Sequence, residues 1–417
     1  MLTLISTSLL GFSPDPLGAL KTALQQELDL LSSVHPSFAL NLGWTSAEGS
    51  FGLAAGNVNV PGQRPRAAVP TDRFLFGSGT KPITATAVLR LVEAGAVSLD
   101  DPVSKHVDSV LQAANGTSMV GLFGSEAAAV TVGHLLHMQS GLPDFDTKTL
   151  DDAILRDGNA EWPPYAILHV AASQIKADKL HFKPGTRVEY SSTNYVMAGL
   201  VLLAHSPDAA NDWTKLDLFS LAFPAELRSK YSNVRFINDE QISTAATVPG
   251  ASGFIPTQNT TIWAQKGGIL GWTCGNMAAS ALDMAHFLND LLVTRAILKP
   301  SSIAIMQQFH LLDYGWAEYR IYYGAGLMIE QPMTTSPGHR RGPPQFDQWG
   351  AYMGHGGDTY GFLSEQGIVS KLGNASFSVV ANMDSDYQFV TNAMACRLIQ
   401  AAAKVLQDTT IDLYCME

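Results

Sequence analysis

The stretch Gly77-Ser78-Gly79-Thr80-Lys81-Pro82 places a serine between two glycines, with a lysine three residues further along the chain. The apolar residues that follow, 83–93, predict a helix, so both side chains would lie on one face near its first turn. The unpaired N–H groups at a helix N-terminus favour a developing negative charge. A serine hydroxyl becomes a good nucleophile when a base takes its proton. A desolvated lysine can act as that base, or it can stabilise the anion of a neighbouring base. The stretch therefore suggests an activated serine, and the alternative is a capping serine beside a solvated lysine.

The composition is that of a globular protein. The 417 residues are 46% hydrophobic and 15% charged, and the chain is long enough for two packed cores or one composite core. The net charge is −11, and no run of Lys and Arg suggests a nucleic-acid groove. No apolar run reaches the length of a membrane span. We therefore expect neither nucleic-acid binding nor a membrane-spanning segment.

Strand patterns and amphipathic helices gather at the two ends of the chain. Leucines at helical spacing predict a helix over 16–33, and apolar residues along one face predict another over 389–406. Alternating or continuous apolar residues predict strands at 38–44, 51–55, 322–330, 360–370 and 377–382.

These patterns predict an α+β fold. Residues 16–100 and 316–417 are expected to form an antiparallel sheet from both chain ends, flanked by helices. Residues 101–315 are expected to form a mostly helical insertion domain.

Two further segments place a tyrosine and a histidine just before a predicted helix and a predicted strand. Tyr190-Ser191-Ser192 lies between a Pro-Gly turn and an apolar helix, and a phenol near a lysine ammonium can act as a general base. His355-Gly356-Gly357 enters a strand, where glycines allow close approach of a ligand and the next N–H can supply half of an oxyanion hole. Taken alone, each has an ordinary explanation, as a core tyrosine and a tight strand entry.

Together and in this order, the three segments resemble the serine hydrolases related to class C β-lactamases and penicillin-binding proteins. The resemblance covers about residues 16–407 and includes the phrases at 134–145 and 275–292. In the second phrase, Ser280 and Asp283 are spaced like a helix-capping box. The resemblance implies a β-lactamase/transpeptidase-like fold and a covalent acyl-enzyme that needs no cofactor.

The resemblance assigns the catalytic roles to three residues. Ser78 matches the acylated nucleophile, Lys81 its activating partner, and Tyr190 the residue that passes a proton to the leaving group. Tyr195 is a second tyrosine near this motif, but the family pattern favours Tyr190, and Tyr195 is expected to pack in the core.

Four more residues are expected to bind the substrate: Ser192, His355, Gly357 and Asp358. The N–H groups of Ser78 and of Asp358, which follows Gly357, match the oxyanion hole. Ser192 stands where many relatives carry asparagine, and His355 stands where the β-lactamases proper usually carry lysine. These departures favour esters or D-amino-acid peptides over β-lactams, although a true β-lactamase stays an alternative.

Other functions compete with this hypothesis. His134 and His137 form an H-x-x-H pair, which can bind zinc, but no H-x-H-x-D motif accompanies it and we expect no metal. A non-catalytic binding or scaffold protein of the same fold is the second alternative. The expected partner is a small-molecule or peptide-like acyl substrate, and the sequence leaves the oligomeric state open.

The N-terminal residues and the sequons favour secretion over a cytoplasmic location. Residues 1–15 begin with an apolar run that reads as a signal segment or a tail, without a basic n-region. Three Asn-x-Ser/Thr sequons lie at Asn115, Asn259 and Asn374. The three cysteines, whose pairing the sequence leaves open, are Cys274, Cys396 and Cys415.

Overall fold

The computed structural model describes most of the chain. The described residues are 15–34, 37–157, 160–252, 260–331, 345–384, 390–411, 413 and 415. The signal-like run and the sequon at Asn259 lie outside them.

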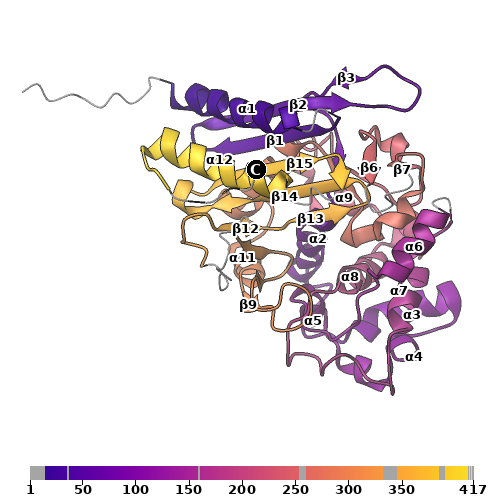
Figure 1. Ribbon diagram of the computed structural model, residues 1–417. Coiled ribbons are helices and arrows are strands. Elements are labelled where there is room, and N and C mark those ends of the chain that lie inside the picture. The colour runs from indigo at the N-terminus through magenta and orange to yellow at the C-terminus, as the bar shows by residue number, and fades with distance from the viewer. Residues whose placement is uncertain are drawn as a thin grey trace, which may run out of the picture.

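One large antiparallel sheet joins the two ends of the chain (Figure 1). Its described strands follow the order β3-β2-β1-β15-β14-β12-β11-β10-β9, with β13 paired to β14. They are β1 (Ala39–Ser46), β2 (Gly49–Val58), β3 (Arg66–Ala67), β9 (His310–Leu311), β10 (Tyr322–Tyr323), β11 (Met328–Glu330), β12 (Tyr352–Gly354), β13 (Gly357–Thr359), β14 (Phe362–Val369) and β15 (Ala375–Ala381). Leu42 of β1 lies opposite both Leu53 and Val379, so the N-terminal hairpin pairs directly with a C-terminal strand. The predicted fold class is confirmed.

Helices cover both faces of this sheet. Helices α1 (Pro16–Val34) and α12 (Val390–Gln407) lie side by side on one face, as Figure 1 shows. The leucines that predicted α1 are all buried there: Leu20, Leu24, Leu28 and Leu31. Helix α10 (Ala281–Leu288) packs on β1 and β15, and Ser280 and Asp283 form the predicted capping box at its start. This helix lies within the range expected for the insertion, yet it packs on the sheet.

The other helices lie between residues 81 and 306 of the sequence. They are α2 (Lys81–Glu93), α3 (Val103–Asn115), α4 (Met119–Phe123), α5 (Val132–Leu136), α6 (Lys148–Arg156), α7 (Pro164–Ala172), α8 (Thr193–Ala204), α9 (Leu218–Ala222) and α11 (Pro300–Met306). Two small sheets accompany them, formed by β4 (Phe74–Leu75), β8 (Met277–Ala279) and β5 (Arg235–Phe236), and by β16 (Met383–Asp384), β6 (Gly250–Ser252) and β7 (Thr260–Ile262). Helices α2 and α8 are buried on nearly every side, so they lie inside the core.

One strand prediction was wrong. Residues 322–330 form two short strands, β10 and β11, which pair with each other as a hairpin. Gly326 has a φ of 74°, a left-handed conformation that glycine adopts without steric cost, and this turns the chain back.

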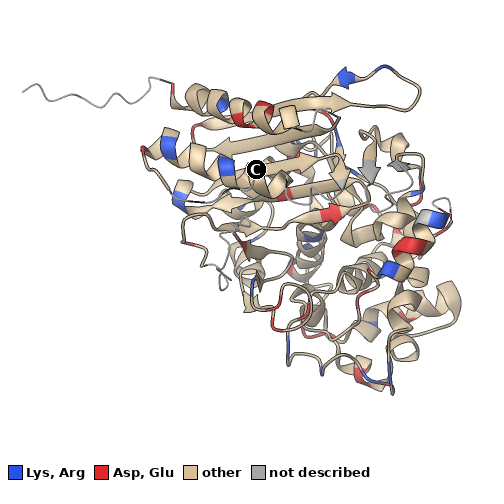
Figure 2. Cartoon of the chain, in the orientation of Figure 1, with Lys and Arg blue, Asp and Glu red and all other residues tan. Residues whose placement is uncertain are grey.

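The cysteine pairing and the charges complete the description. Cys396 of α12 forms a disulfide with Cys415, and Cys274 is free and buried. Lys and Arg are dispersed among Asp and Glu in Figure 2. Within the described part of the chain, every helix is too short or too polar to cross a bilayer.

Candidate active site

Ser78 lies in a short turn that leads directly into a buried helix. Residues Gly77–Thr80 form a 3₁₀ turn, and α2 begins at Lys81, two residues before the apolar run that predicted it. Side chains three apart are eclipsed in a 3₁₀ helix. This geometry places Lys81 Nζ 2.6 Å from Ser78 Oγ, so the two residues are in direct contact.

Tyr190 reaches the same serine from a distant part of the chain. Its hydroxyl donates a hydrogen bond of 2.8 Å to Ser78 Oγ, and Lys81 Nζ lies 5.0 Å from the centre of its ring. The residue precedes α8, whose N-cap is Ser192. Tyr195, one turn into α8, is instead fully buried and donates to Leu136 O at 2.9 Å. The structure therefore brings Ser78, Lys81 and Tyr190 together and leaves Tyr195 in the core.

The lysine is completely buried, and its hydrogen-bond partners are polar oxygens. Besides Ser78 Oγ, Lys81 Nζ approaches Cys274 O at 3.4 Å. Burial opposes the charge of Lys81, but attraction to the ionised forms of Tyr190 and Cys274 acts the other way, so that the pKa of the lysine is raised. Of the two roles that the sequence left open for Lys81, a neutral base or a cation that stabilises the anion of a neighbouring base, the raised pKa favours the second.

Tyr190 has the complementary environment. Burial raises the pKa of its phenol, whereas the Lys81 ammonium acts in the opposite direction. The two groups are therefore coupled, because the ammonium favours the phenolate and the phenolate favours the ammonium. Because they touch, the loss of one proton belongs to the pair and leaves an ammonium next to a phenolate.

Strand β13 lies against the turn that holds Ser78. A Cβ atom on Gly357 would lie 2.0 Å from Phe76 O, a contact that only glycine avoids. A Cβ atom on Gly77, whose φ is 50°, would lie 3.0 Å from Asp358 N. The two glycines thus bring the Asp358 peptide beside the serine turn.

His355 is neutral and lies in the short connection between β12 and β13. Its Nδ1 lies 2.6 Å from Gly356 O, and its Nε2 lies 3.2 Å from the hydroxyl of Tyr323. This arrangement fits an Nδ1–H donor and an Nε2 acceptor. Burial and the nearby Lys81 ammonium lower the pKa of His355 to about 3. The imidazole therefore brings no positive charge to the site.

Ser192 does not take the place of the family asparagine as a partner of the lysine. Among the described residues its hydroxyl forms no hydrogen bond with Lys81, and its backbone N–H donates to Asp144 Oδ1 at 3.0 Å. Burial and the charge of Asp146 raise the pKa of Asp144 from 3.8 to about 7. A carboxyl group that titrates near neutrality therefore lies beside the segment Tyr190-Ser191-Ser192.

Several site residues escaped the sequence analysis. The Cys274 contact uses a backbone carbonyl, which has no sequence signal. Asp144 lies in a phrase that matched the family, but one acidic residue in a loop has no diagnostic spacing. Trp316, whose ring lies 5.2 Å from that of Tyr190, comes from a segment without a recognised motif.

The H-x-x-H pair is used in local structure. His134 Nδ1 accepts the N–H of Thr131 at 3.2 Å, as part of the cap of α5. The two ring nitrogens of His137 lie 3.0 Å from Gly133 O and 3.2 Å from Ile305 O. In the described chain, no group of three or more His, Cys, Asp or Glu residues is arranged to hold a metal ion.

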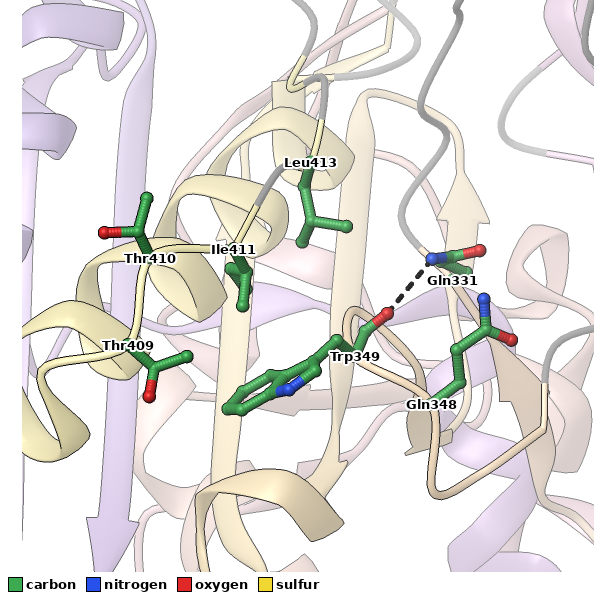
Figure 3. A pocket seen from close by; sticks show the side chains of 7 residues that line it. All are labelled: Gln331, Gln348, Trp349, Thr409, Thr410, Ile411 and Leu413. Atoms are coloured by element: carbon green, nitrogen blue, oxygen red, sulfur yellow. Dashed lines mark hydrogen bonds between the residues drawn. The ribbon is translucent and has the colours of Figure 1, made fainter.

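A separate cavity lies beside the C-terminal tail. It has a volume of about 530 Å³, and Figure 3 shows Trp349 between the glutamines of one wall and the threonines of the other. Its lining residues are Gln331, Gln348, Trp349, Thr409, Thr410, Ile411 and Leu413. None of these residues belongs to the site around Ser78.

The fold and the Ser-Lys-Tyr cluster are those of the β-lactamase/transpeptidase class. Residues 50–389 match the Beta-lactamase family model, and the chain belongs to this family.

Solved structures with the same fold cover almost the whole chain. A D-amino acid amidase from Ochrobactrum anthropi SV3 has a TM-score of 0.69 at 18% identity and covers 93% of this chain and 99% of its own. A D-stereospecific amidohydrolase from Streptomyces sp. has a TM-score of 0.64 at 22% identity and covers 89% of this chain and 98% of its own. An octameric penicillin-binding protein homologue from Pyrococcus abyssi has a TM-score of 0.65 at 19% identity, with 94% and 78% covered.

A curated relative matches over a shorter stretch. Protein flp of Staphylococcus aureus (strain N315) is 31% identical over 153 residues, which is 36% of this chain and 27% of that protein. The match therefore spans about a quarter of the relative's length.

Proposed function

We propose that this protein is a serine hydrolase that forms a covalent acyl-enzyme on Ser78 with a small ester or amide substrate. One observation carries the proposal: Ser78 Oγ lies within hydrogen-bond distance of both Lys81 Nζ and the Tyr190 hydroxyl, at 2.6 and 2.8 Å. Nucleophile and base in direct contact, with a third group fixing the base, is the arrangement that activates a serine.

Acylation starts from the form of the pair that has lost one proton. The Tyr190 phenolate, stabilised by the Lys81 ammonium, takes the hydroxyl proton as Ser78 Oγ attacks the substrate carbonyl carbon. The backbone N–H groups of Ser78 and Asp358 bind the oxyanion of the tetrahedral intermediate. The C–O or C–N bond then breaks, and Tyr190 donates its proton to the departing oxygen or nitrogen.

Deacylation runs through the same groups. A water molecule gives a proton to the Tyr190 phenolate as its oxygen attacks the acyl carbon. The ester bond to Ser78 Oγ breaks, the serine regains a proton from Tyr190, and the carboxylic acid leaves. Lys81 keeps its charge throughout, which agrees with its raised pKa.

The segments Tyr190-Ser191-Ser192 and His355-Gly356-Gly357 indicate which carbonyl compounds suit the site. A neutral His355 offers no positive charge to a substrate carboxylate, and Ser192 is too short to replace an amide-holding asparagine. We therefore propose that esters and amino-acid amides are better substrates than β-lactams. The structural likeness to a D-amino acid amidase supports the amide part of this proposal.

The test is intact mass after incubation with a fluorophosphonate and with a panel of acyl esters, D-amino-acid amides and penicillins. We expect one label on the native protein, none on Ser78→Ala, and persistent labelling of Ser173→Ala, an exposed serine outside the site, as a control. Undiminished labelling of Ser78→Ala would refute the assignment. A native protein that no acyl donor labels would favour the binding or scaffold alternative, and nitrocefin turnover as fast as ester turnover would favour a β-lactamase.

We also propose that the chain functions in an oxidising, extracellular compartment. The Cys396–Cys415 disulfide supports this proposal, because such bonds persist mainly in secreted proteins. The sequon residues Asn115 and Asn374 are exposed, as glycosylation requires. Glycan mass on protein secreted by a eukaryotic host is the measurement that checks it.

A further inference from the structure

The loop at residues 313–320 exposes an unusual set of side chains. Tyr314, Trp316 and Tyr319 are 38%, 57% and 54% exposed. The other large hydrophobic side chains that the described residues expose are leucine and valine. Exposed aromatic residues gathered in one loop are typical of a contact surface for a ligand.

This aromatic loop is fixed to the segment that leads into Tyr190. The N–H of Val188 donates to Asp313 Oδ1 at 2.8 Å, and the guanidinium of Arg187 lies 4.6 Å from the ring of Tyr314. Within the loop, the N–H of Tyr319 donates to Leu312 O at 2.7 Å. The loop therefore keeps a defined position relative to the proposed proton shuttle.

The backbone of the aromatic loop is strained. Ala317 and Tyr319 have φ values of 57° and 58°, a region that residues with side chains adopt at a cost. Gly315, with a φ of 72°, lets the chain approach Glu189, whose Oε1 would be 3.2 Å from a Cβ atom at this position. Strained residues of this kind cluster where a ligand contact has to be held in place.

Trp316 projects from this loop toward the catalytic centre. Its ring lies 5.2 Å from the ring of Tyr190, whose hydroxyl is bonded to Ser78. The proton donated by Tyr190 must reach the leaving atom of the substrate, so a ring packed on Tyr190 lies on the leaving-group side of the site. More than half of the Trp316 side chain remains available to an incoming group.

We propose that Trp316 is a specificity-determining residue that binds a flat, apolar leaving group. The favoured substrates are then esters or amides of arylalkyl or aryl alcohols and amines. This inference rests on the proposed serine-hydrolase function, with Tyr190 as the proton shuttle.

The experiment compares three esters that separate the two sides of the scissile bond. Benzyl acetate and methyl acetate differ only in the leaving alcohol, and their alkoxides have similar basicity. Methyl phenylacetate carries the aromatic ring on the acyl side. We compare kcat/KM for benzyl acetate with kcat/KM for methyl acetate, and for Trp316→Ala we expect this ratio to fall about three- to tenfold. A fall of this size corresponds to the loss of one aromatic contact. It should come mainly from a higher KM for benzyl acetate.

Glu318→Ala is the matched control, because Glu318 belongs to the same loop, is exposed, and carries no aromatic ring. We expect it to leave the ratio unchanged, and Trp316→Phe to retain most of the native ratio. Both positions are exposed, and melting curves verify that the variants fold.

If the native enzyme is active, two results would overturn the inference. One is an unchanged ratio in Trp316→Ala. The other is a fall of kcat/KM for methyl phenylacetate without a fall for benzyl acetate. A native protein that hydrolyses none of these esters and is not labelled at Ser78 refutes the proposed function as well. The two failures are therefore distinguishable.

Discussion

Substitution of the two tyrosines near the second motif gives the sharpest test of the mechanism. Tyr190→Phe removes the hydroxyl that lies 2.8 Å from Ser78 Oγ and keeps the ring with its neighbours Trp316 and Tyr323. Loss of a general base or acid typically costs about a hundredfold to ten-thousandfold in rate. We expect kcat to fall by at least that factor. The melting temperature should change little, because Tyr190 is partly exposed and its ring packing remains.

Tyr195→Phe should have the opposite effects. Its hydroxyl is buried and donates to Leu136 O at 2.9 Å. Removal of this donor leaves a buried carbonyl without its side-chain partner, which costs about 1–3 kcal/mol of stability. The reaction rate should stay close to the native value, because this hydroxyl bonds in the core and not to Ser78.

The assay pairs steady-state hydrolysis of a simple ester with thermal unfolding of all three proteins. Single-turnover acylation, followed by intact mass, shows whether the loss in Tyr190→Phe falls on the covalent step. A kinetic loss at Tyr195 with a native rate at Tyr190 would refute the placement of the shuttle. Equal losses of rate and stability in both variants would indicate that the phenol of Tyr190 is structural.

Two further predictions concern pH. Because the pKa of Tyr190 is raised above its usual 10, the phenolate fraction grows about tenfold per pH unit, and kcat/KM should rise with a slope near one between about pH 7 and 9; a flat profile would contradict Tyr190 as the base. The pKa of Asp144 is raised from 3.8 to about 7, so the folded state holds a proton that the unfolded state has lost, and this carboxyl reduces stability as pH rises through that interval. Asp144→Asn should therefore raise the melting temperature at pH 8 and leave it unchanged at pH 4, and an equal gain at both would disprove the titration argument.

Much of the fold was predictable because its signals are local. Helix α1 follows from leucines at helical spacing, and the hairpin β1–β2 follows from alternation. The single strand predicted at 322–330 failed because apolar content alone does not show where the chain reverses, and Gly326 in its left-handed conformation does so.

The site was only partly predictable, for a different reason. Ser78 and Tyr190 are 112 residues apart in the sequence, and local patterns do not show that the two side chains meet in space. The resemblance to a family predicted that contact. Contacts made by the carbonyl of Cys274 and by the ring of Trp316 depend on how distant loops pack. Such contacts follow from the three-dimensional structure alone.

The protonation of the pair shows how the structure changes the chemical argument. Burial alone disfavours the charge of Lys81, yet a Tyr190 phenolate beside it favours the ammonium. The proton that moves during the reaction must then be carried by Tyr190, since it alone among the two alternates between phenol and phenolate. A fixed ammonium next to a titrating phenol can take a proton from Ser78 and return it to the leaving group without any rearrangement. In the proposed mechanism the same residue thus acts as base and acid in one cycle, and one lysine and one tyrosine suffice at this serine.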